Sequence, residues 1–353
     1  MKILLLFLPI FLLAQIPSGY YDAIQDQTGD ELKTALYNII KGHIEYSYTS
    51  SSTDVWDILK DADEDPNNPA NVILIYSGRS VDAEQEYNNG AGWSREHVWA
   101  KSRGDFGTSN GPGTDAHHLR ACDISVNSAR NNRWFDECSE PYYDGGFNTG
   151  SFTSSSEWVW KPRDEVKGDI ARMMFYMATR YEGDNGEPDL ELIDYIPNDQ
   201  YTNDPIHAKL STLLLWHTQD SVDINEQRRN DIIYSYQNNR NPFIDHPEYV
   251  DLIWGDQSTG MNMNVPEQFE IEPVYPNPTN STFNIPINIE EDMSISINLF
   301  DITGKKSGYE RYFQLSRGDH SLSIDLNNQQ SGVYLVQTVL NKHTNLQRII
   351  LLK

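Results

Sequence analysis

Residues 92–134 read GWSREHVWAKSRGDFGTSNGPGTDAHHLRACDISVNSARNNRW, and this stretch decides how the rest of the sequence is interpreted. It holds three of the nine histidines in a chain of 353 residues, and residues 95–133 carry six Lys or Arg against four acidic residues. The whole chain has a formal net charge of −25, so its average surface repels phosphates, which excludes a globally basic nucleic-acid binder. The stretch is therefore the local exception that phosphate binding would require.

The second half of this stretch has the pattern of a strand followed by a helix. A strand is predicted over residues 117–122, and a helix capped at Asp123 or Ser125 is predicted to continue through Ala129 to Trp134. Three polar side chains share one face of that helix because they lie three and four positions apart: Asn127, Arg130 and Asn131. A phosphate at that face would meet an amide and a guanidinium together.

Three side chains of the stretch supply the chemistry that phosphodiester hydrolysis needs. Histidine titrates near neutral pH, so His97 suits the general base that deprotonates water. Carboxylate and amide oxygens are hard ligands, so Glu96 and Asn127 suit Mg²⁺. Neighbours in a regular strand point to opposite faces, so a site shared by Glu96 and His97 predicts a bulged or looped backbone.

The adjacent pair His117 and His118, together with Asp115, supports an alternative of another class, a zinc-dependent phosphoesterase. Adjacent histidines rarely share one tetrahedral ion, and the stretch contains no HExxH or CxxC motif. We therefore expect one of the two histidines to be a buried hydrogen-bonding prop and the other to face the site.

The rest of the chain divides into segments. A Lys followed by an apolar run predicts a signal peptide over residues 1–14, and no later run is long enough to span a membrane. Residues 20–255 are irregular and aromatic-rich, with helices predicted at Val166–Tyr181, whose Met stripe is expected to be core, and at Leu210–Trp216. Residues 256–273 have neither a helical nor a strand period and are predicted to be a linker.

Residues 274–353 change to a period of two. Short alternating runs predict five strands, at 283–289, 295–299, 321–326, 333–340 and 346–352. Half-buried strands of this length predict a small antiparallel sandwich. Nothing in it has the character of a catalytic residue.

Composition sets the broad class of the protein. With 38% hydrophobic and 11% aromatic residues, the chain is a folded, soluble, acidic protein and not a disordered acidic tail. Its two cysteines, Cys122 and Cys138, are too few for a disulfide scaffold. Their spacing leaves open whether they pair after export.

Five ordered blocks between Tyr20 and Trp254 resemble the bacterial endonuclease I family, whose members belong to the His-Me finger (ββα-metal) superfamily. The blocks are SREHVW at 94–99, DAHHLR at 115–120, VNSARNN at 126–132, KGDIARMMFYM at 167–177 and QNNRNPFID at 237–245. The resemblance implies an α+β fold: a mostly helical nuclease domain that contains a ββα-metal finger, followed by a small all-β, Ig-like sandwich. Ala100 departs from the family pattern, because a proline usually follows the His-Val-Trp triplet.

The same resemblance implies roles for individual residues. His97 would be the general base, and Glu96 and Asn127 would bind one divalent cation, Mg²⁺ with Mn²⁺ or Ca²⁺ as alternatives. Arg130 matches a recurring arginine of the finger helix and is expected to act in catalysis. Four further residues are expected to contact substrate: Arg95, His117, Arg120 and Asn131. The arginine that stabilises the leaving group in relatives has no clear counterpart, and Arg95, Arg103 and Arg120 all remain candidates.

The C-terminal segment resembles the sorting domain of the type IX secretion system. The matching pieces are VYPNPT at 274–279, DITGK at 301–305, SGVY at 331–334 and the basic end at Lys353. This implies a protein of a Gram-negative, Bacteroidetes-type bacterium that is exported through the periplasm and outer membrane and is then secreted or held at the cell surface. The export machinery is then one expected partner, and DNA or RNA backbone is another.

The sequence thus supports a monomeric, secreted, metal-dependent endonuclease that leaves 5′-phosphate ends and has little sequence preference. The alternative is a surface binding or adhesion protein on an inactive nuclease scaffold, which the net charge of −25 and the sorting domain would also suit. His97, Glu96 and Asn127 argue against that alternative, because a binding module has no reason to keep a base and its metal ligands together.

Overall fold

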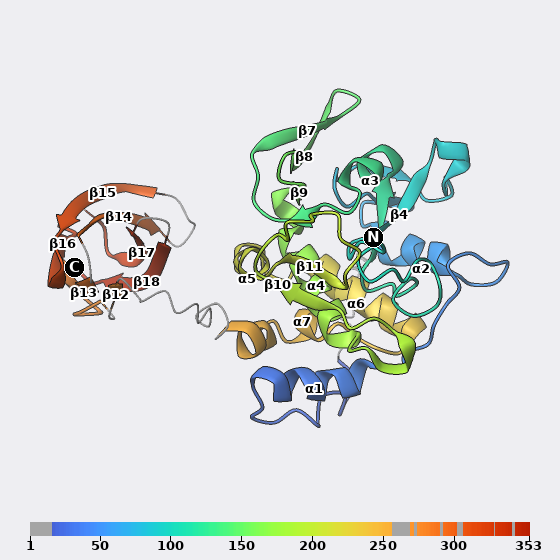
Figure 1. The fold of residues 1–353 in the computed structure, drawn as a ribbon, viewed down its shortest axis with the longest axis horizontal. Coiled ribbons are helices and arrows are strands. Elements are labelled where there is room, and N and C mark those ends of the chain that lie inside the picture. The colour runs from blue at the N-terminus through green and yellow to red at the C-terminus, as the bar shows by residue number, and fades with distance from the viewer. Residues whose placement is uncertain are drawn as a thin grey trace, which may run out of the picture. The chain divides into compact units, whose positions relative to one another are not determined.

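The structure is a computed structural model that describes residues 16–255, 269–271, 274–289, 292–301, 306–327, 329–340 and 343–353. The signal peptide predicted at 1–14 lies outside these residues, as does most of the linker predicted at 256–273. The chain forms two compact units, one up to Met261 and one from Asn262 onward (Figure 1). Each unit has a core of its own.

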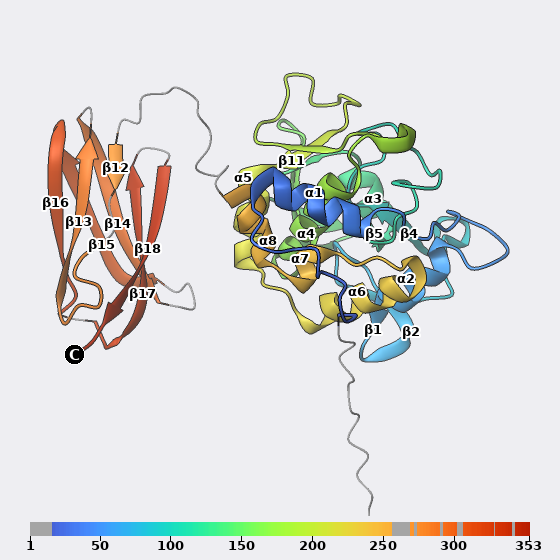
Figure 2. The ribbon, with the colours of Figure 1, turned by 90° about the horizontal axis from the view of Figure 1, so that it is seen from below.

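Helix α4 (Lys167–Arg180) is the centre of the first unit. All of its residues except Asp169 are buried, which confirms the interpretation of its Met stripe as core. The helix begins and ends within one residue of the predicted range. It packs against α1 (Gly29–Ile40), α5 (Leu210–Gln219) and α7 (Pro242–Asp245), and Figure 2 shows it lying among these helices. The other α-helices of the described residues are α2 (Val55–Ala62), α3 (Ile124–Arg130), α6 (Ile224–Gln237) and α8 (Glu248–Val250).

Four small sheets accompany these helices within residues 16–255, so the first unit is mixed and not mostly helical as predicted. One sheet contains β1 (Glu64–Asp65), β2 (Asn68–Ile73) and β3 (Ser80–Asp82). A second contains β6 (Trp134–Phe135), β9 (Val159–Lys161), β8 (Phe147–Ser154) and β7 (Glu140–Asp144), with the β7–β8 hairpin projecting from the unit in Figure 1. The other two are the pairs β10 (Glu191–Ile193) with β11 (Ile206–Lys209) and β4 (Trp93–His97) with β5 (Leu119–Asp123).

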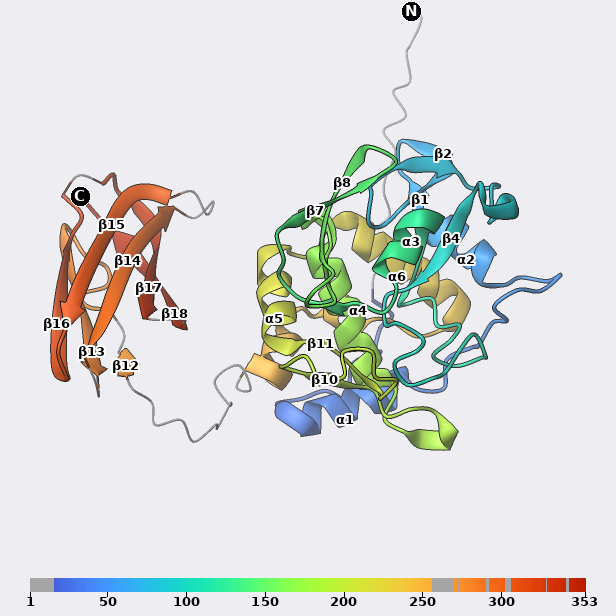
Figure 3. The same cartoon turned by 45° about the horizontal axis from the view of Figure 1, so that its top comes forward.

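The β4–β5 pair leads directly into α3, and Figure 3 shows α3 beside β4. Asp123 is the N-cap residue of α3, although its side chain makes no capping hydrogen bond. The helix ends at Arg130 and not at Trp134 as predicted, because Asn131 leaves it with φ 53° and ψ −130°. Asparagine reaches positive φ more readily than most residues. Trp134 and Phe135 then join a sheet as β6.

The named strands of the second unit pair antiparallel in two sheets, as the period of two predicted. One sheet contains β12 (Phe269–Ile271), β13 (Thr282–Ile289) and β16 (Gly318–Asp325), and the other contains β15 (Lys306–Leu315), β14 (Met293–Asp301), β17 (Gly332–Leu340) and β18 (His343–Leu351). Alternate residues of β13 are buried, and both sheets contribute to one core. Strand β15 was not predicted, and β12 lies within the segment predicted as linker.

Candidate active site

Strand β4 presents two opposite faces, and the candidate residues Glu96 and His97 lie on different ones. Its ladder with β5 is regular, pairing Glu96 with Arg120 and His97 with Leu119. Side chains alternate between the faces of a regular strand. The bulge predicted for a site shared by Glu96 and His97 is therefore not present in this pair of strands.

Helix α3 is fastened to the face of β4 that carries Glu96. The amide Nδ2 of Asn127 donates to Ser94 Oγ at 3.1 Å and to the Arg95 carbonyl at 3.2 Å. Asn127 is half-buried, and its Oδ1 has no hydrogen-bond partner among the residues that the structure describes. The predicted ligands Glu96 and Asn127 therefore lie on the same side of β4.

Glu96 is a buried carboxyl group with two polar neighbours. It is 2% exposed, the Tyr76 hydroxyl donates to its Oε1 at 2.8 Å, and Arg130 Nη1 lies 3.2 Å from the same oxygen. Burial raises the pKa of Glu96 to about 7, against the opposing effects of Arg130 and Tyr76. Burial thus opposes the charged form of this carboxyl group, and the Arg130 guanidinium and the Tyr76 hydroxyl favour it.

Arg130 is fully buried, and both of its terminal nitrogens contact protein groups. Its Nη1 donates to the His97 carbonyl at 3.1 Å, and its Nη2 donates to the Val98 carbonyl at 2.6 Å and lies 3.2 Å from His207 Nε2. Together with the ion pair to Glu96, these bonds hold the end of β4 in place. The geometry suits a residue that positions Glu96 and the chain after His97.

His97 is held as a neutral imidazole. Its Nε2 lies 3.0 Å from the Gly113 carbonyl oxygen. Its ring stacks on that of Tyr48, with the ring centroids 5.6 Å apart and an angle of 22° between the ring planes. Burial, followed by the neighbouring His118, keeps the pKa of His97 well below its usual range. When Nε2–H donates to Gly113, the lone pair is on Nδ1, which is the state that a general base requires.

The loop that carries the Gly113 carbonyl is tightly packed. A Cβ on Gly113 would lie 2.5 Å from the Ser109 carbonyl oxygen and 2.9 Å from the Gly107 carbonyl oxygen. Only a residue without a side chain fits this close approach of backbone to backbone. The acceptor for His97 is therefore fixed by the packing of its own loop.

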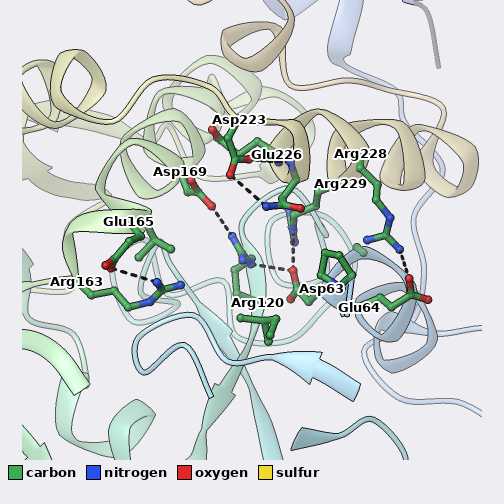
Figure 4. Close-up of a pocket in the computed structure, with 15 residues that line it drawn as sticks. Asp63, Glu64, Arg120, Arg163, Glu165, Asp169, Asp223, Glu226, Arg228 and Arg229 are labelled. Carbon is green, nitrogen blue, oxygen red and sulfur yellow. Dashed lines mark hydrogen bonds and ion pairs between the residues drawn. The ribbon is translucent and has the colours of Figure 1, made fainter. Parts of the chain in front are cut away.

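Two predicted substrate-binding arginines are bound to the protein itself. The Arg95 guanidinium lies 3.4 Å from the ring centre of Tyr48 and 4.0 Å from that of Trp56, and it donates to the Tyr48 carbonyl. Arg120 lines a cavity of about 210 Å³, where its Nε lies 2.9 Å from Asp63 and its Nη1 donates to Asp169 at 3.2 Å (Figure 4). Both arginines hold elements together in this structure.

The histidines of the DAHHLR block are both buried, and they point to different partners. His117 Nε2 lies 3.1 Å from the Asn239 carbonyl, and His118 Nε2 lies 2.7 Å from the Pro112 carbonyl. The His118 ring lies 5.6 Å from the His97 ring, so His118 belongs to the His97 corner while His117 supports the core. We expected one of these histidines to support the fold and the other to face the site. Both support the fold through bonds to backbone carbonyls, and His118 also adjoins His97.

Both carboxylate oxygens of Asp115, a ligand in the zinc hypothesis, accept hydrogen bonds from other side chains. Its Oδ2 accepts from the hydroxyls of Tyr176 and Tyr181 at 2.8 and 2.9 Å, and its Oδ1 accepts from Gln237 at 2.9 Å. Within the described residues, no group of three or more His, Cys, Asp or Glu is placed to hold a metal ion. Asp115, His117 and His118 therefore do not form a common ligand cage.

Burial of neutral histidines should make the fold sensitive to acid. Burial lowers the pKa of His117 to about 4, so between pH 6.5 and pH 4 the unfolded chain binds this proton and the folded chain does not. This contribution to stability is present above pH 6.5 and is lost as the pH falls toward 4, at a cost on the order of 1–3 kcal/mol. In urea titrations, His117→Gln should therefore lose less stability over this range than the parent protein.

A control for this measurement is His246→Gln, since the His246 side chain is 31% exposed. It should leave the pH dependence of unfolding as in the parent. An equal slope in His117→Gln and the parent would contradict the assignment of a buried neutral His117.

Several residues of the site are not predicted from the sequence. Tyr76 and Tyr48 come from outside the 92–134 stretch and contact Glu96 and His97. Lys101 is exposed, has no ion pair among the described residues, and lowers the pKa of His97 through its charge. Asn131, predicted to bind substrate, is exposed at the end of α3. Only the local excess of positive charge pointed toward Lys101.

Comparison with known proteins gives matches for both units. The family model described as Endonuclease I matches residues 28–248, and the one described as a secretion system C-terminal sorting domain matches residues 273–352. The chain is similar to an extracellular ribonuclease of Bacillus subtilis (strain 168), with 53% identity over 236 residues that cover 67% of this chain and 78% of that protein. It is also similar to an extracellular ribonuclease of Bacillus amyloliquefaciens, with 52% identity over 238 residues and the same two shares.

Among solved structures, dimeric latent PorU from Porphyromonas gingivalis matches 24% of this chain and 9% of its own chain, with 16% identity and a TM-score of 0.21. A TM-score this low carries no argument. Within the described residues, none of the helices has the length and apolar character needed to cross a membrane.

Proposed function

The chain belongs to the endonuclease I family, and we propose that it is a divalent-metal-dependent endonuclease that hydrolyses phosphodiesters of DNA and RNA to 5′-phosphate ends. Its type IX sorting domain makes it a secreted or cell-surface protein. The name of the two Bacillus relatives, extracellular ribonuclease, supports RNA as one substrate. Contacts to the nucleic-acid backbone carry no sequence information, so we expect little sequence preference.

The observation that carries this proposal is the state of His97. Its Nε2 is committed to the Gly113 carbonyl at 3.0 Å, its pKa lies well below the usual range, and it is the last residue of β4. A neutral imidazole fixed through one nitrogen can accept a proton on the other. A nuclease can use such an imidazole as its base, and His97 differs from the likewise buried His117 in its place next to Glu96 at the end of β4.

We propose a single hard cation on the side of β4 that carries Glu96 and Asn127. Glu96 supplies a carboxylate, and Asn127 supplies an amide oxygen without a partner among the described residues. Mg²⁺ keeps several waters and needs few protein oxygens, so two such ligands suit it, and Mn²⁺ or Ca²⁺ would use the same atoms. When bound, the cation would supply positive charge to neutralise the phosphate and its leaving oxygen.

Arg130 links the two faces of β4 in this proposal. Its guanidinium holds the Glu96 carboxylate and also the carbonyl of His97, although the side chains of Glu96 and His97 lie on opposite faces. The base and the ligands are thus fixed relative to each other at the end of β4. We infer that water attacks the phosphodiester at the His97 end of β4, where the two faces of the strand meet.

In this reaction, His97 Nδ1 accepts a proton from water while the new P–O bond forms and the bond from phosphorus to the 3′ oxygen breaks. One product carries a 5′-phosphate and the other a 3′-hydroxyl, whose proton comes from solvent. Lys101 is exposed near His97, and so its ammonium group is suited to attract the phosphate.

The test of this function is cleavage by the full chain of supercoiled plasmid and of single-stranded RNA in Mg²⁺. Both polymers should be cut internally. A 5′-phosphate-dependent exonuclease should digest the resulting fragments, but it should no longer digest fragments that have first been treated with phosphatase. Binding of either polymer without release of fragments would instead support the alternative, a surface binding protein on an inactive scaffold. Fragments that resist the exonuclease before phosphatase treatment would contradict the 5′-phosphate assignment.

A further inference from the structure

A cluster of aromatic rings and an arginine lies just beyond the C-terminal end of α3. The rings of Trp158 and Tyr201 meet edge to face, with centroids 4.8 Å apart at 69°. The Arg133 guanidinium lies 4.0 Å from the centre of the Trp158 ring. Tyr201 is 53% exposed, while Trp158 and Arg133 are half-buried. We call these three residues the aromatic platform.

Trp158 holds an unusual backbone conformation in this cluster. It ends the turn between β8 and β9 with φ 58°, in the left-handed region that bulky residues rarely adopt. Its indole Nε1 donates to Asn132 Oδ1 at 2.8 Å, and this bond fixes the ring against the segment that follows α3. Strain of this kind persists where the surrounding structure imposes it, and it is concentrated at functional sites.

A buried arginine ties together the two segments that form the platform. Arg103 is fully buried, and its Nη2 donates to the carbonyls of Asn132 at 2.6 Å and of Gln200 at 3.1 Å. Its Nη1 donates to the Thr202 carbonyl at 3.3 Å. The residues on both sides of Tyr201 are therefore anchored to the residue beside Arg133. The backbone on both sides of Tyr201 is thus anchored, and its ring packs edge to face against Trp158.

The platform is continuous with the candidate active site. Arg130, which holds Glu96, also donates from Nη1 to the carbonyl of Asn131 at 3.1 Å. Asn132 follows at once and holds Trp158. The backbone from Arg130 to Asn132 therefore connects the residue that holds Glu96 with the residue that holds Trp158.

We propose that the platform stacks one unpaired nucleobase on Tyr201, so that the site takes single-stranded nucleic acid more tightly than duplex. This inference rests on the proposed nuclease function for its setting. Every base offers an aromatic face, and a fixed exposed ring can stack on it regardless of sequence. In a duplex that face is already covered by neighbouring bases, so only an unstacked strand can use it. Arg133, which stacks on Trp158 and donates to the Ala129 carbonyl, adds a positive charge to the platform.

The experiment measures binding separately from cleavage. In EDTA, fluorescence anisotropy reports the affinity of the full chain for a fluorescein-labelled oligothymidylate and for a duplex of equal length. Tyr201→Ala should weaken binding of the single strand by about tenfold, as expected for loss of one stacked base, and leave duplex binding within about twofold. Tyr201→Phe keeps the ring and should bind the single strand as the parent does.

Tyr195→Ala is the matched control, since Tyr195 is 59% exposed and precedes Tyr201 in the loop between β10 and β11. It should change neither affinity. Equal losses for single strand and duplex in Tyr201→Ala, or no loss at all, would overturn the proposal. Equal loss in Tyr195→Ala would also overturn it, because the loop as a whole and not the platform would then be responsible.

The outcome for the platform is distinguishable from that for the nuclease function. A parent protein that binds single strands through Tyr201 and cleaves neither polymer in Mg²⁺ would keep this inference and reject the nuclease function. If the parent cleaves both polymers and Tyr201→Ala binds the single strand as tightly as the parent does, the nuclease function is kept and this inference is rejected. With active protein, Tyr201→Ala should raise KM for single-stranded RNA by about tenfold and leave kcat nearly unchanged.

Discussion

Replacing His97 with glutamine is expected to lower kcat for plasmid cleavage by about 10²- to 10⁴-fold, the range that a positioned general base contributes. The glutamine amide can still donate to the Gly113 carbonyl, which His97 Nε2 contacts at 3.0 Å, but it cannot accept a proton at neutral pH. KM should change far less, because the His97 side chain is only 6% exposed and offers substrate little area. Steady-state rates at saturating Mg²⁺ measure both constants.

Two comparisons keep this result from being an effect of unfolding. His97→Gln should retain the far-UV circular dichroism spectrum of the parent at the assay temperature. His246→Gln, a change at a half-buried histidine that contacts none of the candidate site residues, should leave kcat at the parent value. A His97→Gln protein that is folded and cleaves plasmid within tenfold of the parent rate would show that another group is the base.

The second large effect concerns the metal. EDTA should abolish cleavage by the parent, and Mg²⁺ should restore it. Asn127→Ala removes the amide oxygen that we assign as a ligand, and Glu96→Gln removes the negative charge of the other. We expect each change to raise the Mg²⁺ concentration that gives half-maximal rate by about 10- to 100-fold. Removing a group that only hydrogen-bonds to a metal ligand already lowers metal affinity by about this factor.

Asn127 has a second role that the variants must separate, because its Nδ2 also fastens α3 to β4 through Ser94 and Arg95. Asn127→Asp loses that donor but keeps a hard oxygen, so it should need less Mg²⁺ than Asn127→Ala. Ser128→Ala, at an exposed position of the same helix, should titrate like the parent. Identical Mg²⁺ titrations for Asn127→Ala, Glu96→Gln and the parent would contradict the ligand assignment.

The elements that could be predicted from the sequence are those fixed by local periodicity. Helix α4 has apolar residues at helical spacing all along its length, and β13 alternates strictly between buried and half-exposed residues, so both lie close to their predicted bounds. The end of α3 could not be predicted in the same way. Asn131 is compatible with a helix by spacing, and only the pairing of Trp134 and Phe135 with β9 shows where the helix must stop.

The site was predictable in its residue types and less so in its geometry. The sequence places Glu96 and His97 side by side, and the regular ladder with β5 sends their side chains to opposite faces. The partners that fix them, Tyr76 and Gly113, are distant or lie in a loop without periodicity. Local reasoning identifies which groups can do chemistry, but tertiary contacts decide how they are held.

The arginines show the same limit. A surplus of positive charge in residues 95–133 pointed to phosphate binding, yet Arg95, Arg103, Arg120 and Arg130 are each buried against rings, carbonyls or carboxylates. Charge alone does not distinguish an arginine that meets substrate from one that binds backbone carbonyls inside the fold. The exposed Lys101 was counted in that surplus but was given no role.

The two thiols have a consequence for how the first unit is held together. Cys122 and Cys138 are both free, and burial raises the pKa of Cys122 well above its usual value and that of Cys138 to about 11. The thiolate is the form that reacts, so neither sulfur is readily oxidised or exchanged near neutral pH. No disulfide joins these two thiols, so the packed core and hydrogen bonds hold the first unit together without one.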